Sequence, residues 1–255
     1  MKLEGKIAVV IGGTQGIGES VAKRLAADGA NVGVVASASL PKAQAVADAI
    51  KASGGNAFAE RADVTDADAL KAMVERIVKE YGGVDIMVNC AGVFYPTPAG
   101  ETSSSQVDRM VDINLKGSFH AVSAVAPFMK GAGGGKIVSV SSCAGFMGMA
   151  NYALYCATKS AIIMMTRALA VELAPHGINV NAIAPGNTAT PMNEDIRTKP
   201  ELAGFLKAMA ERTPSGQTYS SPEEMAGLVA FLVSKDARAM HGSTVLIDEG
   251  FTAGI

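Results

Sequence analysis

Tyr155 and Lys159 lie four positions apart, so a helix would place both side chains on one face. A tyrosine hydroxyl can act as a general acid or base, but its unperturbed pKa is about 10. A lysine ammonium about 4 Å away would favour the phenolate by about 4 kcal/mol at an effective dielectric constant of about 20, and so lower the tyrosine pKa. The pair is therefore a candidate for proton transfer, with an ordinary exposed helix pair as the alternative. Tyr152 is a weaker candidate because Cys156, not a lysine, follows it by four residues.

A glycine-rich stretch near the start of the chain reads Gly12-Gly13-Thr14-Gln15-Gly16-Ile17-Gly18. A turn that takes positive φ and brings backbone close to a phosphate excludes a Cβ, which explains glycine there. The free N–H groups and partial positive charge of a helix N-terminus would then face the pyrophosphate. An apolar run precedes the stretch and a helical pattern follows it, which favours dinucleotide binding over a plain tight turn.

The residues about 20 positions beyond these glycines bear on the choice of cofactor. A dinucleotide fold that selects NAD usually carries an acid there, bonded to the ribose 2′-hydroxyl. This chain has Ala36-Ser37-Ala38-Ser39 instead, and no Asp or Glu lies between Asp28 and Asp48. The missing carboxylate favours NADP over NAD, although no arginine is at hand and Lys42 is the nearest base. Ser37 is the candidate contact, with a polar turn as the alternative.

Strands and helices alternate along the chain, which predicts a parallel sheet covered by helices on both faces. The expected strands are 6–11, 31–36, 56–62, 84–89, 136–141, 179–184 and 244–248. The expected helices are 17–28, 41–53, 66–81, 105–129, 151–174 and one from 222. Residues 185–221 are expected to be irregular with one short helical piece. Right-handed crossovers then give a Rossmann-type, doubly wound α/β sheet of about seven strands that binds ligands at its carboxyl edge.

The composition indicates one globular domain over residues 1–255, since 49% of the residues are hydrophobic and 18% charged. A net charge of -2 without a basic stripe argues against nucleic acid and anionic membrane as partners. No run of about 18 apolar residues and no signal-peptide pattern is visible. Cys90, Cys143 and Cys156 match no zinc spacing and are interpreted as free thiols. We therefore expect a cytoplasmic protein without a metal.

The sequence resembles the short-chain dehydrogenase/reductase family over nearly its whole length. The glycine loop fits that family's Gly-x-x-x-Gly-x-Gly pattern, and Tyr155 and Lys159 fit its Tyr-x-x-x-Lys. The segment Asn89-Cys90-Ala91-Gly92 resembles the family's Asn-Asn-Ala-Gly. The overall pattern is closest to the 3-oxoacyl-carrier-protein reductase branch, which shades into sugar, polyol and secondary-alcohol dehydrogenases.

Further matches lie in the second half of the chain. Asn114 matches the asparagine of the family's Asn-x-x-Gly, and Ser142 matches its active-site serine. Pro185-Gly186 and Thr190 match the segment after the sixth strand, whereas Thr188 replaces a usual aliphatic residue. Each motif alone is modest, but their common order and spacing favour the resemblance.

The resemblance implies that a ketone and a secondary alcohol are interconverted by hydride transfer to or from a nicotinamide. Tyr155 would exchange a proton with the carbonyl oxygen, and Ser142 would hydrogen-bond that oxygen. Lys159 would bind the nicotinamide ribose and tune Tyr155, while Asn114 would hold a water that links Lys159 to solvent.

The cofactor contacts that the resemblance implies come from the glycine loop and from the ends of later strands. They are Gly12, Thr14, Gln15, Gly16, Ile17, Gly18, Ser37, Asp63, Val64, Asn89, Ala91, Gly92, Tyr155, Lys159, Pro185, Gly186, Thr188 and Thr190. Asp63 and Val64 would hold the adenine, and Thr190 would bind the carboxamide. Gln15 stands where many NADP-preferring members carry a base, which weakens the case for NADP.

Loops at the strand ends should form the substrate pocket. The candidates are Phe94, Tyr95, Cys143, Phe146, Met147, Tyr152, Gly186 and Met192, with a lid at about residues 190–215. Core or lid packing is the alternative for each aromatic residue and methionine. A reductase of 3-oxoacyl thioesters or a broad carbonyl reductase is the leading expectation, and a sugar, polyol or other alcohol dehydrogenase is the alternative. A non-catalytic nucleotide-binding regulator is a second class. The family pattern implies a homotetramer formed partly by the two long helices.

Overall fold

The structure, a computed structural model, describes residues 3–253, without the side chains of 202 and 205, so the outermost two residues at each end of the expected 1–255 domain lie outside it. The strands are β1 (Ile7–Ile11), β2 (Asn31–Ala36), β3 (Asn56–Arg61), β4 (Ile86–Asn89), β5 (Gly135–Val140), β6 (Ile178–Pro185) and β7 (Thr244–Ile247). They form one parallel sheet in the order β3-β2-β1-β4-β5-β6-β7, which confirms the predicted Rossmann-type fold. The strand order reverses between β1 and β4, where such sheets open a crevice for ligands.

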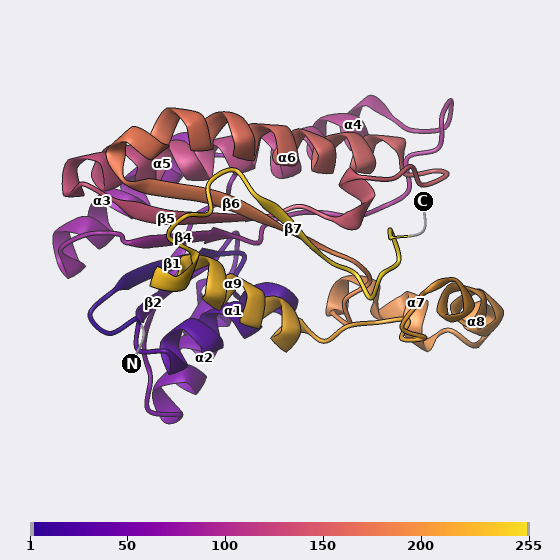
Figure 1. Cartoon of the computed structure of the whole chain (residues 1–255), viewed down its shortest axis with the longest axis horizontal. Helices are drawn as coiled ribbons and strands as arrows, with labels where there is room; N and C mark the ends of the chain where they lie inside the picture. The colour runs from indigo at the N-terminus through magenta and orange to yellow at the C-terminus, as the bar shows by residue number, and fades with distance from the viewer. Residues whose placement is uncertain (1–2, 254–255) are drawn as a thin grey trace.

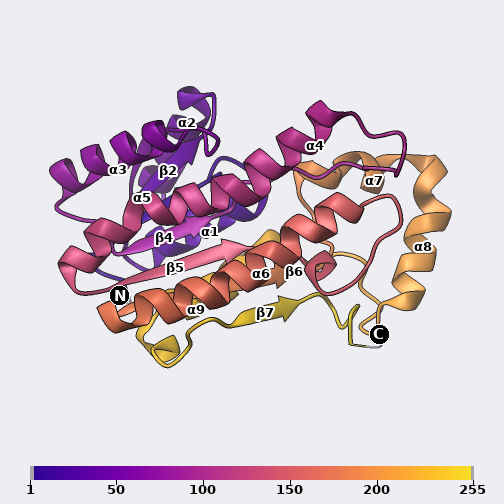
Figure 2. The same cartoon turned by 90° about the horizontal axis from the view of Figure 1, so that it is seen from above.

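Helices cover both faces of the sheet (Figure 1). One face carries α1 (Gly16–Ala27), α2 (Leu40–Ala52) and α9 (Pro222–Val233), and the other carries α3 (Ala67–Tyr81), α5 (Gly117–Ala132) and α6 (Ala153–Leu173). Figure 2 shows α5 and α6 lying side by side across the sheet. Alternate side chains of β1 contribute to the hydrophobic cores on the two faces of the sheet. Val10 packs in the core on the α1 side, and Val9 packs in the core on the α3 side. Burial on both faces explains the apolar strand runs.

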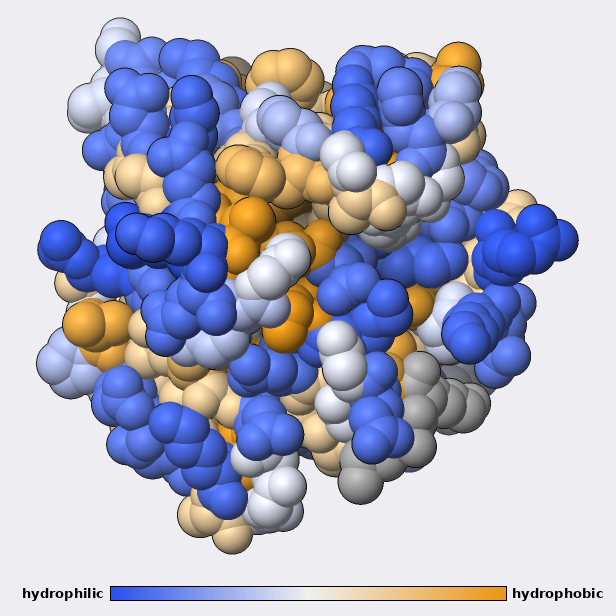
Figure 3. Space-filling model, turned by 90° about the vertical axis from the view of Figure 1, so that its left-hand side faces the viewer, coloured by the Kyte–Doolittle hydropathy of each residue, from blue (hydrophilic) through white to orange (hydrophobic). Residues whose placement is uncertain are grey.

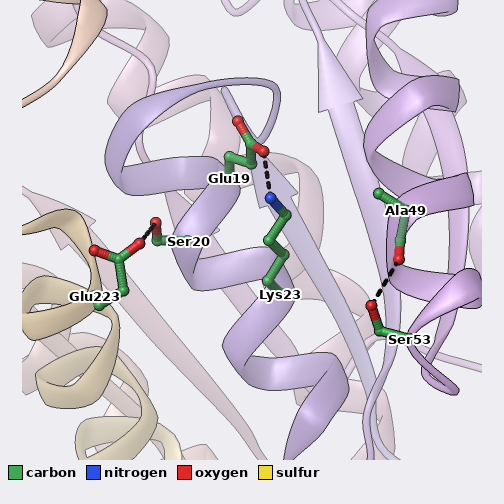
Figure 4. A network of polar contacts seen from close by, with 6 residues as sticks. All are labelled: Glu19, Ser20, Lys23, Ala49, Ser53 and Glu223. Carbon is green, nitrogen blue, oxygen red and sulfur yellow. Dashed lines mark hydrogen bonds and ion pairs between the residues drawn. The ribbon is translucent and has the colours of Figure 1, made fainter.

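One polar bond at the surface joins α1 to α9, and a second interaction lies within α1 (Figure 4). Ser20 Oγ donates to Glu223 Oε1 at 3.0 Å, and Lys23 Nζ pairs with Glu19 one turn away at 2.6 Å. Exposed ion pairs of this kind contribute about 0.5 kcal/mol or less. The fully buried Leu25 and Val229 belong to the core that these helices share, so apolar packing is what holds α1 in place.

The long helix expected over 105–129 is three segments. They are α4 (Ser104–Met110), a π-helical turn (Val111–Lys116) and α5, which continues to Ala132. Gly133 then ends α5 in a left-handed conformation with φ of 76°. A π-helical turn widens the helix by one residue and often marks a functional position. Asn114 lies within it.

The segment expected to be irregular after residue 185 contains two helices, α7 (Glu194–Thr198) and α8 (Ala203–Arg212). They lie at one end of the molecule, beyond the carboxyl ends of the strands (Figure 1). The two stems of this segment meet, since Ala189 N donates to Ser220 O and Ser220 N donates to Asn187 O, each at 2.9 Å. Figure 3 views the opposite end, which is mostly hydrophilic around a small hydrophobic centre. Outside this segment and 104–132, the predicted boundaries hold within two residues.

One helical stretch within residues 3–253, Ala153–His176, is long and apolar enough to cross a membrane by length and composition. The sequence reading did not anticipate such a stretch. It is a weak sign of a membrane span, because the core helix of a globular fold passes the same test. Here the stretch comprises α6 and the turn after it, and α6 buries Ile162 and Lys159 against the rest of the fold.

Candidate active site

A cleft of about 940 Å³ runs along the carboxyl edge of the sheet and under the segment 190–215. Most of the predicted site residues line it. These are Gly12, Thr14, Gln15, Gly16, Ile17, Gly18, Ser37, Asp63, Val64, Ala91, Gly92, Phe94, Ser142, Cys143, Tyr152, Tyr155, Lys159, Pro185, Gly186, Thr188, Thr190 and Met192. Five predicted residues do not line it: Asn89, Tyr95, Asn114, Phe146 and Met147.

The glycine loop leaves no room for side chains. Gly12 and Gly16 have φ of 74° and 53°, a region that favours glycine. A Cβ on Gly12 would lie 2.9 Å from Ala91 N, and one on Gly18 would collide with the Gly12 carbonyl oxygen. The N-cap residue of α1, Gln15, makes no side-chain capping bond, so its side chain leaves the first N–H groups of the helix unblocked. The loop therefore fits a pyrophosphate at the helix N-terminus.

The other end of the cleft would receive the adenosine. Val64 lines it and packs against Gly117, where a Cβ would lie 2.6 Å from Val64. Asp63 Oδ1 accepts bonds from Thr65 N and Thr65 Oγ1 at 2.9 and 2.8 Å, which fixes its carboxylate. The exposed Ser37 follows β2 directly.

Sequence reasoning missed a base beside Ser37. The register of the sheet pairs Ala36 at the end of β2 with Arg61 at the end of β3. Arg61 is exposed, and its neighbours Ala62 and Asp63 line the cleft. Residues 25 positions apart in the chain become neighbours only through strand pairing. If the expected second and third strands are paired in parallel, their carboxyl ends lie side by side, and this pairing would have indicated Arg61.

The candidate catalytic side chains come from β5 and α6. Ser142 lies two residues beyond β5, where its Oγ accepts a bond from Ala144 N at 3.1 Å. Tyr155 and Lys159 share one face of α6, as predicted. Lys159 is 5% exposed, and its Nζ donates to Val140 O at 2.9 Å while lying 5.6 Å from the centre of the Tyr155 ring.

The expected lowering of the Tyr155 pKa is wrong for this arrangement. Burial raises the pKa of Tyr155 to about 12, only partly opposed by a hydrogen bond with Ser142. Burial also lowers the pKa of Lys159 to about 8. The Lys159 amine donates its hydrogen bond to the Val140 carbonyl oxygen. Burial removes water from both Tyr155 and Lys159, which disfavours the charged form of each. The phenol is therefore protonated at neutral pH.

Asn114 is fully buried and sits behind Gly92 instead of lining the cleft. Its Oδ1 accepts from Val93 N at 2.8 Å, and its Nδ2 donates to Val93 O at 3.0 Å and to Thr158 Oγ1 at 3.3 Å. Both amide protons are thus used inside the protein. One acceptor position on Oδ1 remains for the water that the sequence predicts there.

Asn89 is also buried and shapes the loop after β4 from within. Its Nδ2 donates to Ser118 Oγ at 3.0 Å, and its Oδ1 accepts from Ala91 N at 3.2 Å. These bonds give Asn89 a supporting role in the loop, and its direct contact with the cofactor stays a prediction. Cys90 lines the cleft in its place, and burial raises the pKa of this thiol to about 12.

The substrate end is bounded by aromatic side chains. Phe94 stacks on Tyr152, with ring centres 4.7 Å apart and planes at 7°, and meets Tyr155 edge-on at 4.8 Å and 74°. Phe146 follows the short turn 143–145, is 44% exposed and does not line the cleft.

Several cleft residues were not predicted. Met149, Ile196, Met209 and Tyr219 add apolar surface, and Ser105, Asp108, Arg109 and Asp112 add polar groups from α4 and the π-helical turn. Ile196 lies on α7, Met209 on α8 and Asp112 in the π-helical turn, where the sequence predicted only one short helical piece and an unbroken helix over 105–129. Within the described residues, no group of three or more His, Cys, Asp or Glu could hold a metal ion.

A doubly wound sheet with a glycine loop after β1, a serine just beyond β5, and a tyrosine and a lysine on α6 defines a nucleotide-dependent oxidoreductase. The family model described as short chain dehydrogenase matches residues 6–201, and the chain belongs to this family. It is an NAD(P)-dependent oxidoreductase that interconverts a carbonyl and an alcohol.

Characterised relatives span nearly the whole chain. A 3-oxoacyl-[acyl-carrier-protein] reductase of Staphylococcus aureus is 36% identical over 96% of this chain and 97% of its own. A galactitol 2-dehydrogenase of Agrobacterium fabrum is 38% identical over 98% of each. The structure of a gluconate 5-dehydrogenase from Burkholderia cenocepacia, solved with NADP and tartrate, superposes with a TM-score of 0.94 at 29% identity, covering 100% of this chain and 98% of that one.

Proposed function

We propose that the protein reduces a ketone to a secondary alcohol, with Tyr155 as the general acid. The observation that carries the role of Tyr155 is its place in the cleft, where its hydroxyl is hydrogen-bonded with Ser142 and its phenol is protonated at neutral pH. A protonated phenol can give its proton to a carbonyl oxygen, whereas removal of a proton from an alcohol needs the phenolate.

The neighbouring side chains would prepare the carbonyl. Ser142 bonds with the Tyr155 hydroxyl, so a carbonyl oxygen between them would accept from both. The Lys159 ammonium would bind ribose hydroxyls and, once there, attract the phenolate left after proton transfer. A bound nicotinamide supplies the hydride that the carbonyl carbon receives.

Tyr155→Phe tests the acid directly. The phenylalanine keeps the ring but removes the proton, so turnover should fall by roughly 10²–10⁴-fold, whereas cofactor binding should weaken by about tenfold at most, the effect of one lost hydrogen bond. Oxidation of the reduced nicotinamide measures turnover, and fluorescence titration measures cofactor binding. Unchanged turnover would refute the assignment and favour a nucleotide-binding regulator.

For the cofactor, we propose NADP over NAD. Support comes from the absence of any Asp or Glu between Asp28 and Asp48, and from two bases, Lys42 in the first turn of α2 and Arg61 beside Ala36. A 2′-phosphate there would be attracted by these positive charges. Tighter binding of NADH than of NADPH would contradict the proposal.

For the substrate, we propose a 3-oxoacyl thioester or another ketone with an apolar body. Phe94, Met149, Met192, Met209 and Tyr219 give the cleft an apolar wall, and the reductase relative from Staphylococcus aureus points the same way.

A polyol or sugar alcohol is the second candidate. The polar side chains of Asp108, Arg109 and Asp112 at the cleft and the galactitol 2-dehydrogenase relative favour it. A screen of 3-oxoacyl thioesters, diketones and polyols separates the two. Turnover of polyols alone would contradict the apolar proposal.

We further propose that residues 1–255 form one domain with a substrate lid at 190–215, and that four copies assemble. Apolar side chains lie exposed on two separate surfaces, with Phe119, Met164 and Val171 on α5 and α6, and Phe231 and Leu246 on α9 and β7. Two distinct self-complementary surfaces are what a tetramer of D2 symmetry needs. Light scattering that gives a monomer mass would contradict the assembly.

We propose the cytoplasm as the location and a small molecule as the only partner besides further copies of the chain. Cys90, Cys143 and Cys156 are all free thiols, which suits a reducing compartment. The acidic net charge of -2 offers nucleic acid and anionic membrane little attraction. Fractionation of cells into cytosol and membranes tests this location.

A further inference from the structure

Phe94 touches the candidate acid directly. The edge of one ring meets the face of the other at a centre distance of 4.8 Å, and the opposite contact of Phe94 is the stacked ring of Tyr152. Edge-on and stacked pairs are the preferred aromatic geometries and restrict ring orientation. Tyr155 is thus held by a ring that is itself held by a second tyrosine of the same helix.

A buried network fixes the backbones that carry these rings. Asn114 bonds both the N–H and the C=O of Val93, the residue before Phe94. The same Asn114 amide donates to Thr158 Oγ1, which in turn donates to Tyr155 O at 2.9 Å. One side chain in the π-helical turn therefore ties the loop of Phe94 to the helix of Tyr155.

We propose that Phe94 is a positioning residue for the general acid. Its ring fixes the orientation of the Tyr155 phenol and keeps water away from it. Asn114 holds the backbone next to Phe94 and so sets the position of the ring. The inference rests on the proposed role of Tyr155 as acid. It assigns Phe94 a task beyond lining the substrate pocket. Loss of the ring should admit water, which stabilises the phenolate and moves the Tyr155 pKa down toward its ordinary value.

The test compares Phe94→Ala and Phe94→Leu with a matched control, Phe58→Leu. Phe58 also stacks on a tyrosine, Tyr81, at 4.0 Å and 13°, but lies on β3 away from the cleft. The Tyr155 ionisation is obtained from ultraviolet difference spectra of each variant against the same variant carrying Tyr155→Phe, without cofactor or substrate. We expect Phe94→Ala to lower the Tyr155 midpoint by about one pH unit. Phe58→Leu should leave it unchanged.

The kinetic readout is the pH profile of kcat for ketone reduction. Phe94→Leu keeps an apolar side chain but loses the edge contact, so kcat should fall about 3- to 10-fold. In Phe94→Ala the alkaline limb should move to lower pH, because the acid loses its proton sooner.

The outcomes separate the two proposals. A higher KM alone, with the Tyr155 midpoint and the kcat profile unmoved in both variants, would overturn the inference and leave Phe94 as pocket lining. A lowered Tyr155 midpoint with an unmoved kcat profile would uphold the contact but refute the proposed role of Tyr155. Because Phe94→Leu preserves most of the buried surface, it keeps the test valid if Phe94→Ala fails to fold.

Discussion

Lys159 should reduce the stability of the protein that it serves. Its ammonium is buried, with one hydrogen bond to the Val140 carbonyl, and its pKa falls from the ordinary 10.5 to about 8. Each pKa unit corresponds to about 1.4 kcal/mol, so folding with a charged Lys159 costs about 3 kcal/mol at neutral pH. Lys159→Met removes that cost and loses one hydrogen bond worth about 1 kcal/mol. We therefore expect the variant to be about 2 kcal/mol more stable at pH 7, and inactive.

The pH dependence identifies the cause. Between pH 8 and 10.5 the unfolded wild type binds a proton at Lys159 that the folded protein has released, so wild-type stability rises with pH through this window. The cost is fully present below pH 8 and absent above 10.5. The advantage of Lys159→Met should therefore shrink across the window and disappear at its upper end.

Urea unfolding at equal protein concentration and at a series of pH values measures this difference. Lys71→Met is the control, because it removes an exposed lysine of α3 and should change stability by no more than about 0.5 kcal/mol at any pH. A Lys159→Met protein that is less stable than wild type at pH 7 would refute the reasoning. So would an advantage that does not change with pH.

Three further changes test the framework of the fold. Gly12→Ala would place a Cβ 2.9 Å from Ala91 N and should abolish cofactor binding, which fluorescence titration measures. A Cβ at Gly131 meets nothing within 4 Å, so Gly131→Ala should stabilise α5 by about 0.5–1 kcal/mol in thermal unfolding. Asn114→Ala would leave both backbone groups of Val93 without their partner and should cost about 2–4 kcal/mol in urea unfolding; a smaller loss than 1 kcal/mol would contradict the network described above.

The parts of the fold that the sequence predicts well are those governed by local patterns. Buried β-branched runs set the strands, and Asp66 and Gly82 bound α3 as a side-chain cap and a left-handed end. Tyr155 and Lys159 share a helix face because helical spacing is fixed. Local chemistry decides each of these features, so a single sequence suffices.

Features that depend on contacts between distant segments could not be predicted in this way. The π-helical turn holds Asn114, whose amide bonds Val93 and Thr158, and no residue pattern predicts such a turn. The backbone of Arg61 lies beside Ala36 only through the register of β2 and β3.

The direction of the Tyr155 pKa was mispredicted for the same reason. The spacing to Lys159 shows the nearby charge, but not the loss of water around both groups. Burial raises the Tyr155 pKa, a hydrogen bond with Ser142 opposes it only in part, and the lysine bonds a carbonyl instead of the phenol.

The two ends of the segment 190–215 are held together, so its sequence can change without a change in the sheet. Because Thr188 and Ser220 pair with one another, the backbone leaves the sheet and returns to it at adjacent points. The ends of the loop between β6 and α9 therefore stay together whatever its sequence. Lengthening this loop adds little to the conformational entropy lost when its ends are joined. The segment carries three residues that line the cleft, Met192, Ile196 and Met209. All three can be substituted together without a change at Tyr155 or at the residues that hold it. Substitutions in this segment would then change the lining of the cleft without moving the backbone that carries Tyr155.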